Sequence, residues 1–229
     1  MELPRQLCLD LPHRPALGRE DFLVAPSNQE AVAWLDAWPR WPGKTLALCG
    51  PAGCGKSHLA HGFAAAVGAG IVEAATLDRE QPPPLLAHQP ALVIEDADQR
   101  TDPVALLHLY NAALAAGVGL LLTTRLPPAR WGISLLDLHS RLATLPVALI
   151  APPDDALMAA VLVKLFADRQ LRVGPEVIDF LLRHMERSFD VARAVVAAAD
   201  HLAFARRKPV AVPLIADVVR QLCQANTGS

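Results

Sequence analysis

The sequence predicts an α/β protein in which a parallel sheet flanked by helices is followed by a smaller, all-helical part. Two observations support this fold class. Short apolar stretches alternate with segments of helical spacing between Thr45 and Ile150, which is the pattern of consecutive βαβ units. After Pro153 only helical spacing remains, so the end of the chain is expected to form a separate helical domain.

The strands are expected where apolar residues follow one another. Such runs are typical of strands that are buried on both faces of a parallel sheet. Helices fit between them from Ser57 to about Val67 and from Pro103 to about Ala116, whereas Pro82 to Pro84 are expected to form a loop. The five candidate strands are Thr45 to Cys49, Ala69 to Glu73, Ala91 to Ile94, Leu120 to Thr123 and Pro146 to Ile150.

The helical part is expected to begin behind Asp154 and Asp155, because an aspartate can cap a helix start. Further helices are expected from Gly174-Pro175-Glu176 onward, over roughly Phe189 to Arg206, and from about Pro213 to about Gln224. These boundaries predict a tail at 1–16, an α/β domain at 17–152 and a helical domain at 153–229.

Composition excludes several classes of function. The longest run without a polar side chain, Ala112 to Leu122, is well short of the ~18 residues that a membrane-spanning helix needs. Glu2, Arg5 and Asp10 interrupt any apolar signal-peptide core, so we expect a cytoplasmic protein without a membrane partner. The four cysteines match no CxxC pair and no zinc pattern, which favours isolated thiols. A net charge of −2 offers no broad cationic surface, so contact with DNA is expected to be indirect.

One motif carries a specific chemistry. GPAGCGKS, residues 50–57, fits G-x-x-x-x-G-K-[ST] directly after a predicted strand and directly before a predicted helix. In such a P-loop, backbone N–H groups surround nucleotide phosphates, the lysine meets the outer phosphates and the hydroxyl ligates Mg²⁺. We therefore expect ADP or ATP with Mg²⁺; the alternative is a glycine-rich turn that precedes a helix by chance. The cofactor-binding residues expected here are Gly50, Pro51, Ala52, Gly53, Cys54, Gly55, Lys56, Ser57 and His58.

Two further strand ends carry polar residues. ALVIEDAD places Glu95 and Asp96 where acids meet the metal and the attacking water beside a P-loop. Glu95 and Ser57 are the expected Mg²⁺ ligands, and Asp96 is the expected catalytic acid; the alternative is a pair of acids that end a strand in solvent. LLLTTR ends another strand with Thr123 and Thr124, and we expect the Thr124 hydroxyl near a phosphate, although threonine also favours strands on propensity alone.

Together, these motifs resemble the DnaA/Hda family of AAA+ proteins, which contains a bacterial replication initiator and its shorter regulatory relative. The resemblance implies a P-loop AAA+ domain with a parallel five-stranded sheet and a small helical lid. The matching segments are SNQEAV (27–32), GPAGCGKSHL (50–59), ALVIEDAD (91–98), LLLTTRLPP (120–128), LHSRL (138–142) and RKPVAVPLIADVV (207–219).

The resemblance implies two sites that act on partners. In the family, the arginine of the segment matching LHSRL acts in trans on a nucleotide held by a neighbouring subunit, which implies a catalytic role for Arg141; a surface salt bridge is the alternative. QLCLDL, residues 6–11, resembles the peptide through which Hda-type proteins bind the sliding clamp. In an extended peptide its leucines point to one side; a strand of the chain's own sheet or a disordered tail is the alternative. The expected clamp-binding residues are Gln6, Leu7, Leu9 and Leu11.

The chain departs from the family pattern at two places. It ends at Ser229, before the helix-turn-helix domain with which an initiator would continue, and Asp190 occupies the position that matches the lid's sensor arginine. Arg187 and Arg193 lie within a turn of it and are candidates to replace it. An aspartate would repel phosphate, so we expect weak turnover and a nucleotide, with ADP favoured, that acts mainly as a structural and conformational ligand.

The resemblance therefore implies a negative regulator of DNA replication initiation. It would bind the sliding clamp and stimulate hydrolysis of ATP held by the initiator DnaA, as a homo-oligomer (dimer) in the cytoplasm at the nucleoid or replisome. Two alternatives remain: a self-sufficient AAA+ ATPase such as a helicase loader, and a non-hydrolysing adaptor bound to the clamp.

Overall fold

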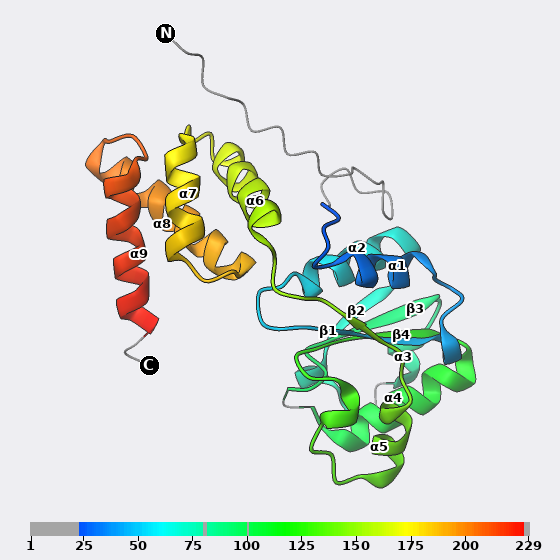
Figure 1. Cartoon of the computed structure of the whole chain (residues 1–229). Helices are drawn as coiled ribbons and strands as arrows, with labels where there is room; N and C mark the ends of the chain where they lie inside the picture. Colours follow the sequence, from blue (N-terminus) through cyan, green and yellow to red (C-terminus); the bar gives the residue numbers. More distant parts are fainter. Residues whose placement is uncertain (1–22, 80–81, 100, 227–229) are drawn as a thin grey trace. The chain divides into compact units, whose positions relative to one another are not determined.

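The computed structural model describes residues 23–79, 82–99 and 101–226 of the chain. These residues form two compact units that divide between Ala151 and Pro152. We call residues 23–151 the α/β unit and residues 152–226 the helical unit, and describe each by itself (Figure 1). Within the described ranges, no helix combines the length and apolar character needed to cross a membrane.

Parallel strands form the centre of the α/β unit. Within the described part of the chain they make one five-stranded sheet in the order β2-β3-β4-β1-β5, and every neighbouring pair is parallel. β4 thus lies between β1 and β3, so the carboxyl ends of these strands meet at one end of the sheet. The strands are β1 (Thr45–Cys49), β2 (Gly70–Glu73), β3 (Ala91–Glu95), β4 (Gly119–Thr124) and β5 (Val147–Leu149).

Burial differs between the central and the outer strands. All residues of β1, β3 and β4 are buried, as consecutive apolar residues predict. The same prediction is wrong for β2 and β5, where Ile71 and Leu149 are exposed. An outer strand has a neighbour on one side only, so part of its apolar surface keeps contact with solvent.

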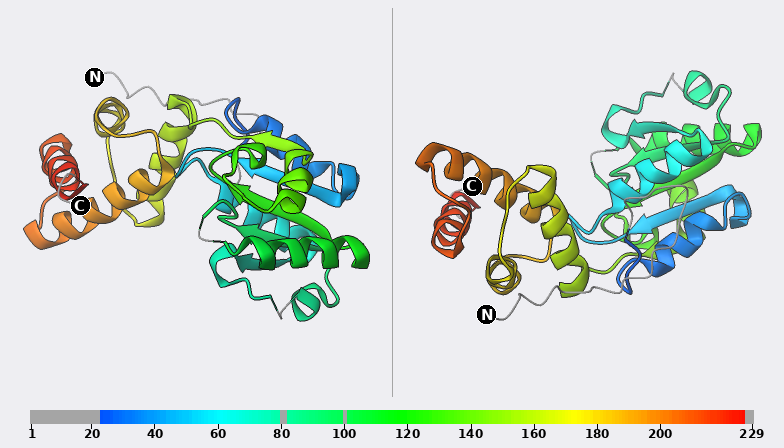
Figure 2. Two further views of the ribbon diagram at one scale, coloured as in Figure 1. Left: turned by 90° about the horizontal axis from the view of Figure 1, so that it is seen from below. Right: turned by 90° about the horizontal axis from the view of Figure 1, so that it is seen from above.

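Helices cover both faces of the sheet (Figure 1 and Figure 2). The α1 and α2 helices lie on one face, and α3, α4 and α5 lie on the other. Because successive strand residues point to opposite faces, Leu121 of β4 joins the apolar cluster of Phe63 in α2, whereas Leu120 and Leu122 join that of Leu106 in α4. The helices are α1 (Gln29–Asp36), α2 (Lys56–Val67), α3 (Pro82–Leu86), α4 (Pro103–Ala116) and α5 (Leu136–Ala143).

Sequence periodicity missed the short helices α1, α3 and α5. The loop expected at Pro82 to Pro84 is wrong, because α3 begins at Pro82. Proline is tolerated in the first turn of a helix, where its missing N–H is not needed. The α1 and α5 helices contain eight residues each, too few to repeat a helical pattern clearly. Short 3₁₀ helices cover Pro42–Lys44, Ala74–Thr76 and Pro128–Arg130.

The helical unit has its own apolar core. Met158, Leu162 and Phe166 of α6 are fully buried, and they pack with Leu181 of α7 and Ile215 of α9. The helices of this unit therefore pack around one shared apolar cluster. The helices are α6 (Asp155–Asp168), α7 (Pro175–His184), α8 (Phe189–Arg206) and α9 (Val212–Asn226).

Polar contacts fasten the ends of these helices. The Asp154 carboxylate accepts a hydrogen bond of 2.8 Å from the N–H of Leu157, so it caps α6 as the sequence predicts. Arg206 at the end of α8 donates to Asp217 of α9 at 2.7 Å, and this hydrogen bond lowers the pKa of Asp217. Arg206 is thus engaged by a carboxylate of its own unit.

Replacing Leu106 by alanine is expected to lower the free energy of unfolding by about 2–5 kcal/mol, because a large core side chain leaves a cavity. Leu106 is 1% exposed and Leu114, on the same helix, is 57% exposed. Leu114→Ala is therefore the matched control, with an expected change of about 0.5 kcal/mol or less. Urea unfolding followed by circular dichroism measures both, and equal losses would contradict the orientation of α4.

Candidate functional site

Backbone and side-chain hydrogen bonds join the carboxyl ends of β1, β3 and β4. The N–H of Gly50 donates to the Thr124 carbonyl at 3.1 Å, and the N–H of Ala97 donates to the Thr123 carbonyl at 2.9 Å. The N–H of Asp96 donates to the Thr123 hydroxyl at 2.9 Å. The structure therefore brings together the start of the P-loop, the two acids and the two threonines, which are far apart in the sequence.

The P-loop between β1 and α2 requires its glycines. Gly53 and Gly55 have φ angles of 68° and 101°, in the left-handed region that side chains disfavour. A Cβ atom on Gly50 would lie 2.5 Å from the Ile150 carbonyl oxygen and 2.8 Å from the Cys54 sulfur. The backbone at Gly50 is thus packed closely against Ile150 and Cys54, which leaves no room for a side chain. The positive φ angles allow successive N–H groups to turn toward an anion.

Lys56 begins α2 and is buried. Its Nζ atom donates hydrogen bonds of 2.8 Å to the carbonyls of Gly50 and Pro51, so the ammonium group lies within the curve of the loop. Among the described residues no side chain caps α2, whose N-cap is Gly55. The N–H groups of its first turn and the positive end of its dipole are therefore directed at the place where an anion would bind.

The other P-loop side chains differ in exposure. Cys54 is buried, whereas Pro51, Ala52, Ser57 and His58 are exposed. Ser57 is thus open to solvent, and His58 lies on the outer surface of α2. Outside the loop, burial at the end of β1 raises the pKa of the Cys49 thiol, and the nearby Asp98 carboxylate adds to the effect.

Glu95 ends β3 as a mostly buried carboxylate with two different oxygens. Its Oε2 atom lies 2.9 Å from Nε2 of His61 on α2, whereas Oε1 is buried without a hydrogen-bond partner among the described residues. A buried carboxylate oxygen without a partner is costly, and a cation or an ordered water would satisfy it. Sequence reasoning missed the contact between His61 and Glu95, which lie 34 positions apart in the sequence.

Asp96 adopts a rare backbone conformation. Its φ angle is 50°, in the left-handed region, and the hydrogen bond to Thr123 holds it there. Its carboxylate is exposed. Strained residues of this kind cluster at functional sites, so the backbone geometry agrees with a functional role for Asp96.

Thr124 is fully buried at the end of β4. Its hydroxyl donates a hydrogen bond of 2.6 Å to the Leu126 carbonyl. It could donate to a phosphate oxygen only in place of that bond, and its contact with a phosphate stays a prediction. Asp98 supports the same turn, because its Oδ2 atom accepts hydrogen bonds from the N–H groups of Arg125 at 2.8 Å and Leu126 at 3.0 Å. Sequence reasoning gave Asp98 no role.

Within the described residues, no group of three or more histidine, cysteine, aspartate or glutamate side chains is arranged to hold a metal ion. A Mg²⁺ ion bound beside a nucleotide usually keeps several waters and needs only one or two protein ligands besides the phosphates. Ser57 and Glu95 would supply two such protein ligands, and their binding of Mg²⁺ stays a prediction.

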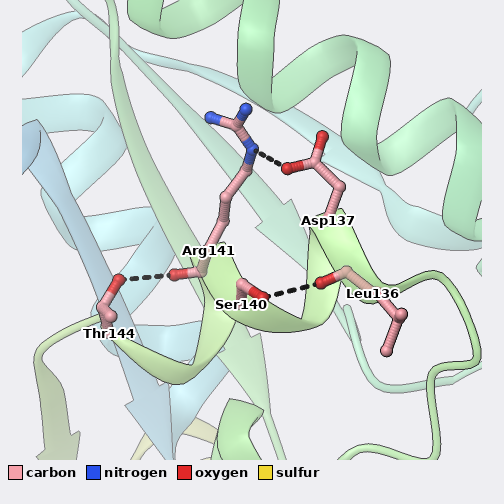
Figure 3. Close-up of polar contacts among 5 residues, drawn as sticks. All are labelled: Leu136, Asp137, Ser140, Arg141 and Thr144. Carbon is pink, nitrogen blue, oxygen red and sulfur yellow. Dashed lines mark hydrogen bonds and ion pairs between the residues drawn. The ribbon is translucent and has the colours of Figure 1, made fainter.

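Arg141 lies on α5, on the opposite face of the sheet from α2. Its side chain is 35% exposed, and its Nε atom donates to Oδ1 of Asp137 at 3.1 Å. The guanidinium carbon lies 6.0 Å from the centre of the Tyr110 ring on α4. Figure 3 shows that the two terminal nitrogens of Arg141 point away from Asp137.

The lid residues singled out in the sequence form ion pairs within the helical unit. Asp190 pairs with Arg193 one turn further along α8. Arg187 pairs with Asp155 of α6 at 2.7 Å. Both arginines that were candidates to replace a sensor arginine are therefore engaged by carboxylates of their own unit. The predicted clamp-binding peptide, Gln6 to Leu11, lies outside the described residues.

Comparisons with known proteins give a fold and no sequence family. The scan against family models and the search of curated proteins both found no match. Among solved structures, domain III of the replication initiation protein DnaA from Thermotoga maritima matches with a TM-score of 0.76 and 19% identity, over 92% of this chain and 98% of that chain.

Two other structures have the same fold. AMPPCP-bound DnaA from Aquifex aeolicus matches with a TM-score of 0.64 and 16% identity, over 86% of this chain and 67% of that chain. The Holliday junction branch migration motor RuvB from Thermotoga maritima matches with a TM-score of 0.64 and 14% identity, over 78% of this chain and 61% of that chain.

The five-stranded parallel sheet with its flanking helices is the AAA+ fold shared by these proteins, so the predicted fold class is confirmed. The chain has the same fold as domain III of DnaA, which it matches over nearly the full length of both chains.

Replacing Gly50 by alanine is expected to lower the free energy of unfolding by about 1–3 kcal/mol, the usual cost of overpacking, because the added methyl group meets the Ile150 backbone. Gly132→Ala is the matched control, since a Cβ atom there meets nothing within 4 Å. Urea unfolding measures both. A Gly50→Ala protein as stable as Gly132→Ala would contradict the close packing of the P-loop.

Proposed function

We propose that this chain is an Hda-like regulator of replication initiation. Held at the DNA-loaded sliding clamp, it presents Arg141 to ATP bound by the initiator DnaA, and hydrolysis of that ATP leaves the initiator in its inactive ADP form. The observation that carries the proposal is a half-buried arginine on α5 whose two terminal nitrogens have no hydrogen-bond or ion-pair partner among the described residues, in a fold that matches domain III of DnaA.

The chain's own P-loop is proposed to bind ADP or ATP. Residues 50–58 surround the phosphates, and the Lys56 ammonium exchanges its two carbonyl contacts for phosphate oxygens. The Thr124 hydroxyl would likewise exchange its hydrogen bond to the Leu126 carbonyl for one donated to a phosphate oxygen. Mg²⁺, held by Ser57 and Glu95, would neutralise phosphate charge. The buried, unpartnered Oε1 atom of Glu95 supports this assignment, as do the bound AMPPCP molecules of two DnaA structures.

We propose that this bound nucleotide is mainly a structural and conformational ligand. The first acid is a glutamate whose Oε2 atom is already engaged by His61, and Asp190 stands where the family has a sensor arginine. Asp190, Arg187 and Arg193 form ion pairs within the helical unit. Asp96 is then the residue that would activate water in any residual turnover.

Arg141 acts on the partner's nucleotide. A guanidinium held beside a transferring phosphoryl group stabilises charge that develops in the transition state, and an arginine supplied in trans accelerates hydrolysis by about 10³ to 10⁵ in other NTPases. The terminal nitrogens of Arg141 have the fork geometry that matches phosphate oxygens. A homodimer of this chain would carry two copies of Arg141, one on each subunit.

Clamp binding, with DNA contact only through the clamp, is proposed from the sequence. Gln6, Leu7, Leu9 and Leu11 form the peptide proposed to enter an apolar groove of the clamp. One DnaA structure is bound to single-stranded DNA; for this chain, whose net charge is −2, we propose that DNA is reached through the clamp.

A second candidate is a self-sufficient ATP-driven motor or helicase loader. The likeness to the RuvB branch migration motor favours it, and Lys56, Glu95 and Asp96 would then serve the chain's own catalysis. This candidate requires steady ATP turnover by the purified chain, whereas the regulator requires turnover only when the initiator is present.

The experiment combines DnaA loaded with labelled ATP, clamp-loaded DNA and this chain. Arg141→Ala is expected to remove nearly all stimulation, a loss of about 10³-fold or down to the background rate. Arg79→Ala is the control, because it removes an exposed arginine that is paired with Asp102 at 2.7 Å. Equal hydrolysis with wild type and Arg141→Ala, or without the chain, would contradict the proposal.

A variant that lacks residues 1–14 tests clamp binding in the same experiment. The shortened chain is expected to stimulate hydrolysis only at much higher concentration, because tethering raises the local concentration of Arg141 near the initiator. Capture on clamp-coated beads measures the contact directly. Unchanged capture by the shortened chain would refute the clamp assignment and leave the role of Arg141 standing.

A further inference from the structure

The contact between Asp137 and Arg141 uses one nitrogen of the guanidinium and leaves two open. Asp137 Oδ1 meets Nε at 3.1 Å. Among the described residues, neither terminal nitrogen has a hydrogen bond or an ion pair (Figure 3). The open side of the fork therefore faces away from the carboxylate that holds it.

Arginines of the helical unit bind acids differently. Arg206 meets Asp217 through a terminal nitrogen at 2.7 Å, and Arg193 meets Asp190 in the same way. Arg187 uses both Nε and a terminal nitrogen on Asp155. In these pairs the carboxylate occupies a terminal nitrogen that could otherwise bind a phosphate. Arg141 is held through Nε alone, as is Arg79 of the α/β unit by Asp102, so the terminal nitrogens of Arg141 remain available.

Two further contacts restrict where the Arg141 fork can lie. The guanidinium lies over the Tyr110 ring of α4 at 6.0 Å, a distance at which a cation and an aromatic face attract each other. The backbone below it is anchored, because Leu138 and Leu142 of the same helix are buried in the core. Asp137 and Tyr110 therefore hold the side chain from two directions above a fixed helix.

The end of α5 is fastened at the same residue. The Thr144 hydroxyl donates a hydrogen bond of 2.8 Å to the Arg141 carbonyl, which satisfies one of the free carbonyls at a helix end. One turn earlier, the Ser140 hydroxyl donates to the Leu136 carbonyl at 2.8 Å (Figure 3). The Cα atom from which Arg141 extends is thus held in position by local bonds.

Stability is a poor explanation for the Asp137–Arg141 contact. Exposed pairs four residues apart on a helix contribute little to folding and are screened by salt. A free arginine side chain, however, samples many rotamers, and a partner's nucleotide would have to select one of them. Holding the side chain in one arrangement before the partner arrives removes that cost from the reaction.

We propose that Asp137 is a positioning residue for Arg141. It holds Nε so that the two terminal nitrogens are presented together to the phosphate oxygens of the partner's nucleotide, with the Tyr110 ring as the support behind the guanidinium. The proposal rests on the function proposed above, since it assigns the residue that orients the arginine acting in trans.

The experiment measures hydrolysis of DnaA-bound ATP over a range of concentrations of this chain, with clamp-loaded DNA present. Asp137→Ala is expected to lower the maximal rate by about three- to tenfold and to leave the half-saturating concentration unchanged, because docking is intact and only the arginine is disordered. Asp137→Asn, which keeps the shape and loses the charge, is expected to show a smaller loss, and Asp137→Glu to restore most of the rate.

Asp168→Ala is the matched control. Asp168 also pairs with a basic residue four positions away, Lys164 of α6. Its side chain is 58% exposed, and that of Asp137 is 56% exposed. Both substitutions remove one surface carboxylate from a helix, so an equal effect of the two would show that lost charge, and no positioning of Arg141, lowers the rate. Circular dichroism melting of each variant checks that the fold is retained.

A double variant separates the two proposals. In an Arg141→Ala background, Asp137→Ala is expected to have no further effect, because the residue that it orients is absent. If Arg141→Ala abolishes stimulation while Asp137→Ala matches the wild type, the positioning role is refuted and the role of Arg141 stands. A higher rate with Asp137→Ala would also refute it, since Asp137 would then restrain the arginine. Unchanged stimulation by Arg141→Ala would refute the function itself.

Discussion

The position of β4 between β1 and β3 is the constraint on which the rest of the structure depends. Parallel pairing of β4 with both neighbours brings the ends of all three strands to one end of the sheet. Hydrogen bonds from Gly50 to Thr124 and from Asp96 to Thr123 then lock the P-loop, the acids and the threonines together. A separate consequence of the layers is that Arg141 lies on the opposite face of the sheet from α2.

Much of this arrangement could be predicted from the sequence, because its signals are local. Runs of apolar residues mark the buried strands. GPAGCGKS indicates a phosphate-binding loop, because a predicted strand precedes it and a predicted helix follows it. Leu120 to Thr123 were predicted as a strand, and the strand extends by one residue at each end to Gly119–Thr124. The helices of the helical unit were found because apolar spacing persists over several turns, as in Phe189–Arg206.

The features that escaped prediction depend on contacts between distant residues. The hydrogen bond between His61 and Glu95 joins residues 34 positions apart, and no local sequence pattern predicts it. The same holds for Tyr110 beneath Arg141. Exposure of β2 and β5 follows from sheet order, which composition does not encode. Asp137 is the exception, since its spacing of four from Arg141 is visible in the sequence, although the nitrogen that it engages is not.

The central claim is that the P-loop end of the sheet holds a nucleotide through Lys56. Calorimetric titration of Mg²⁺ and ADP into the full chain tests it most directly, with Lys56→Ala as the variant and Lys44→Ala, which loses a lysine bonded to the Gly117 carbonyl, as the control. The account predicts one site in the wild type and in Lys44→Ala, and a loss of affinity of about tenfold or more in Lys56→Ala, because a charge-assisted contact to phosphate is removed. Equal affinity of Lys56→Ala and the wild type would contradict it.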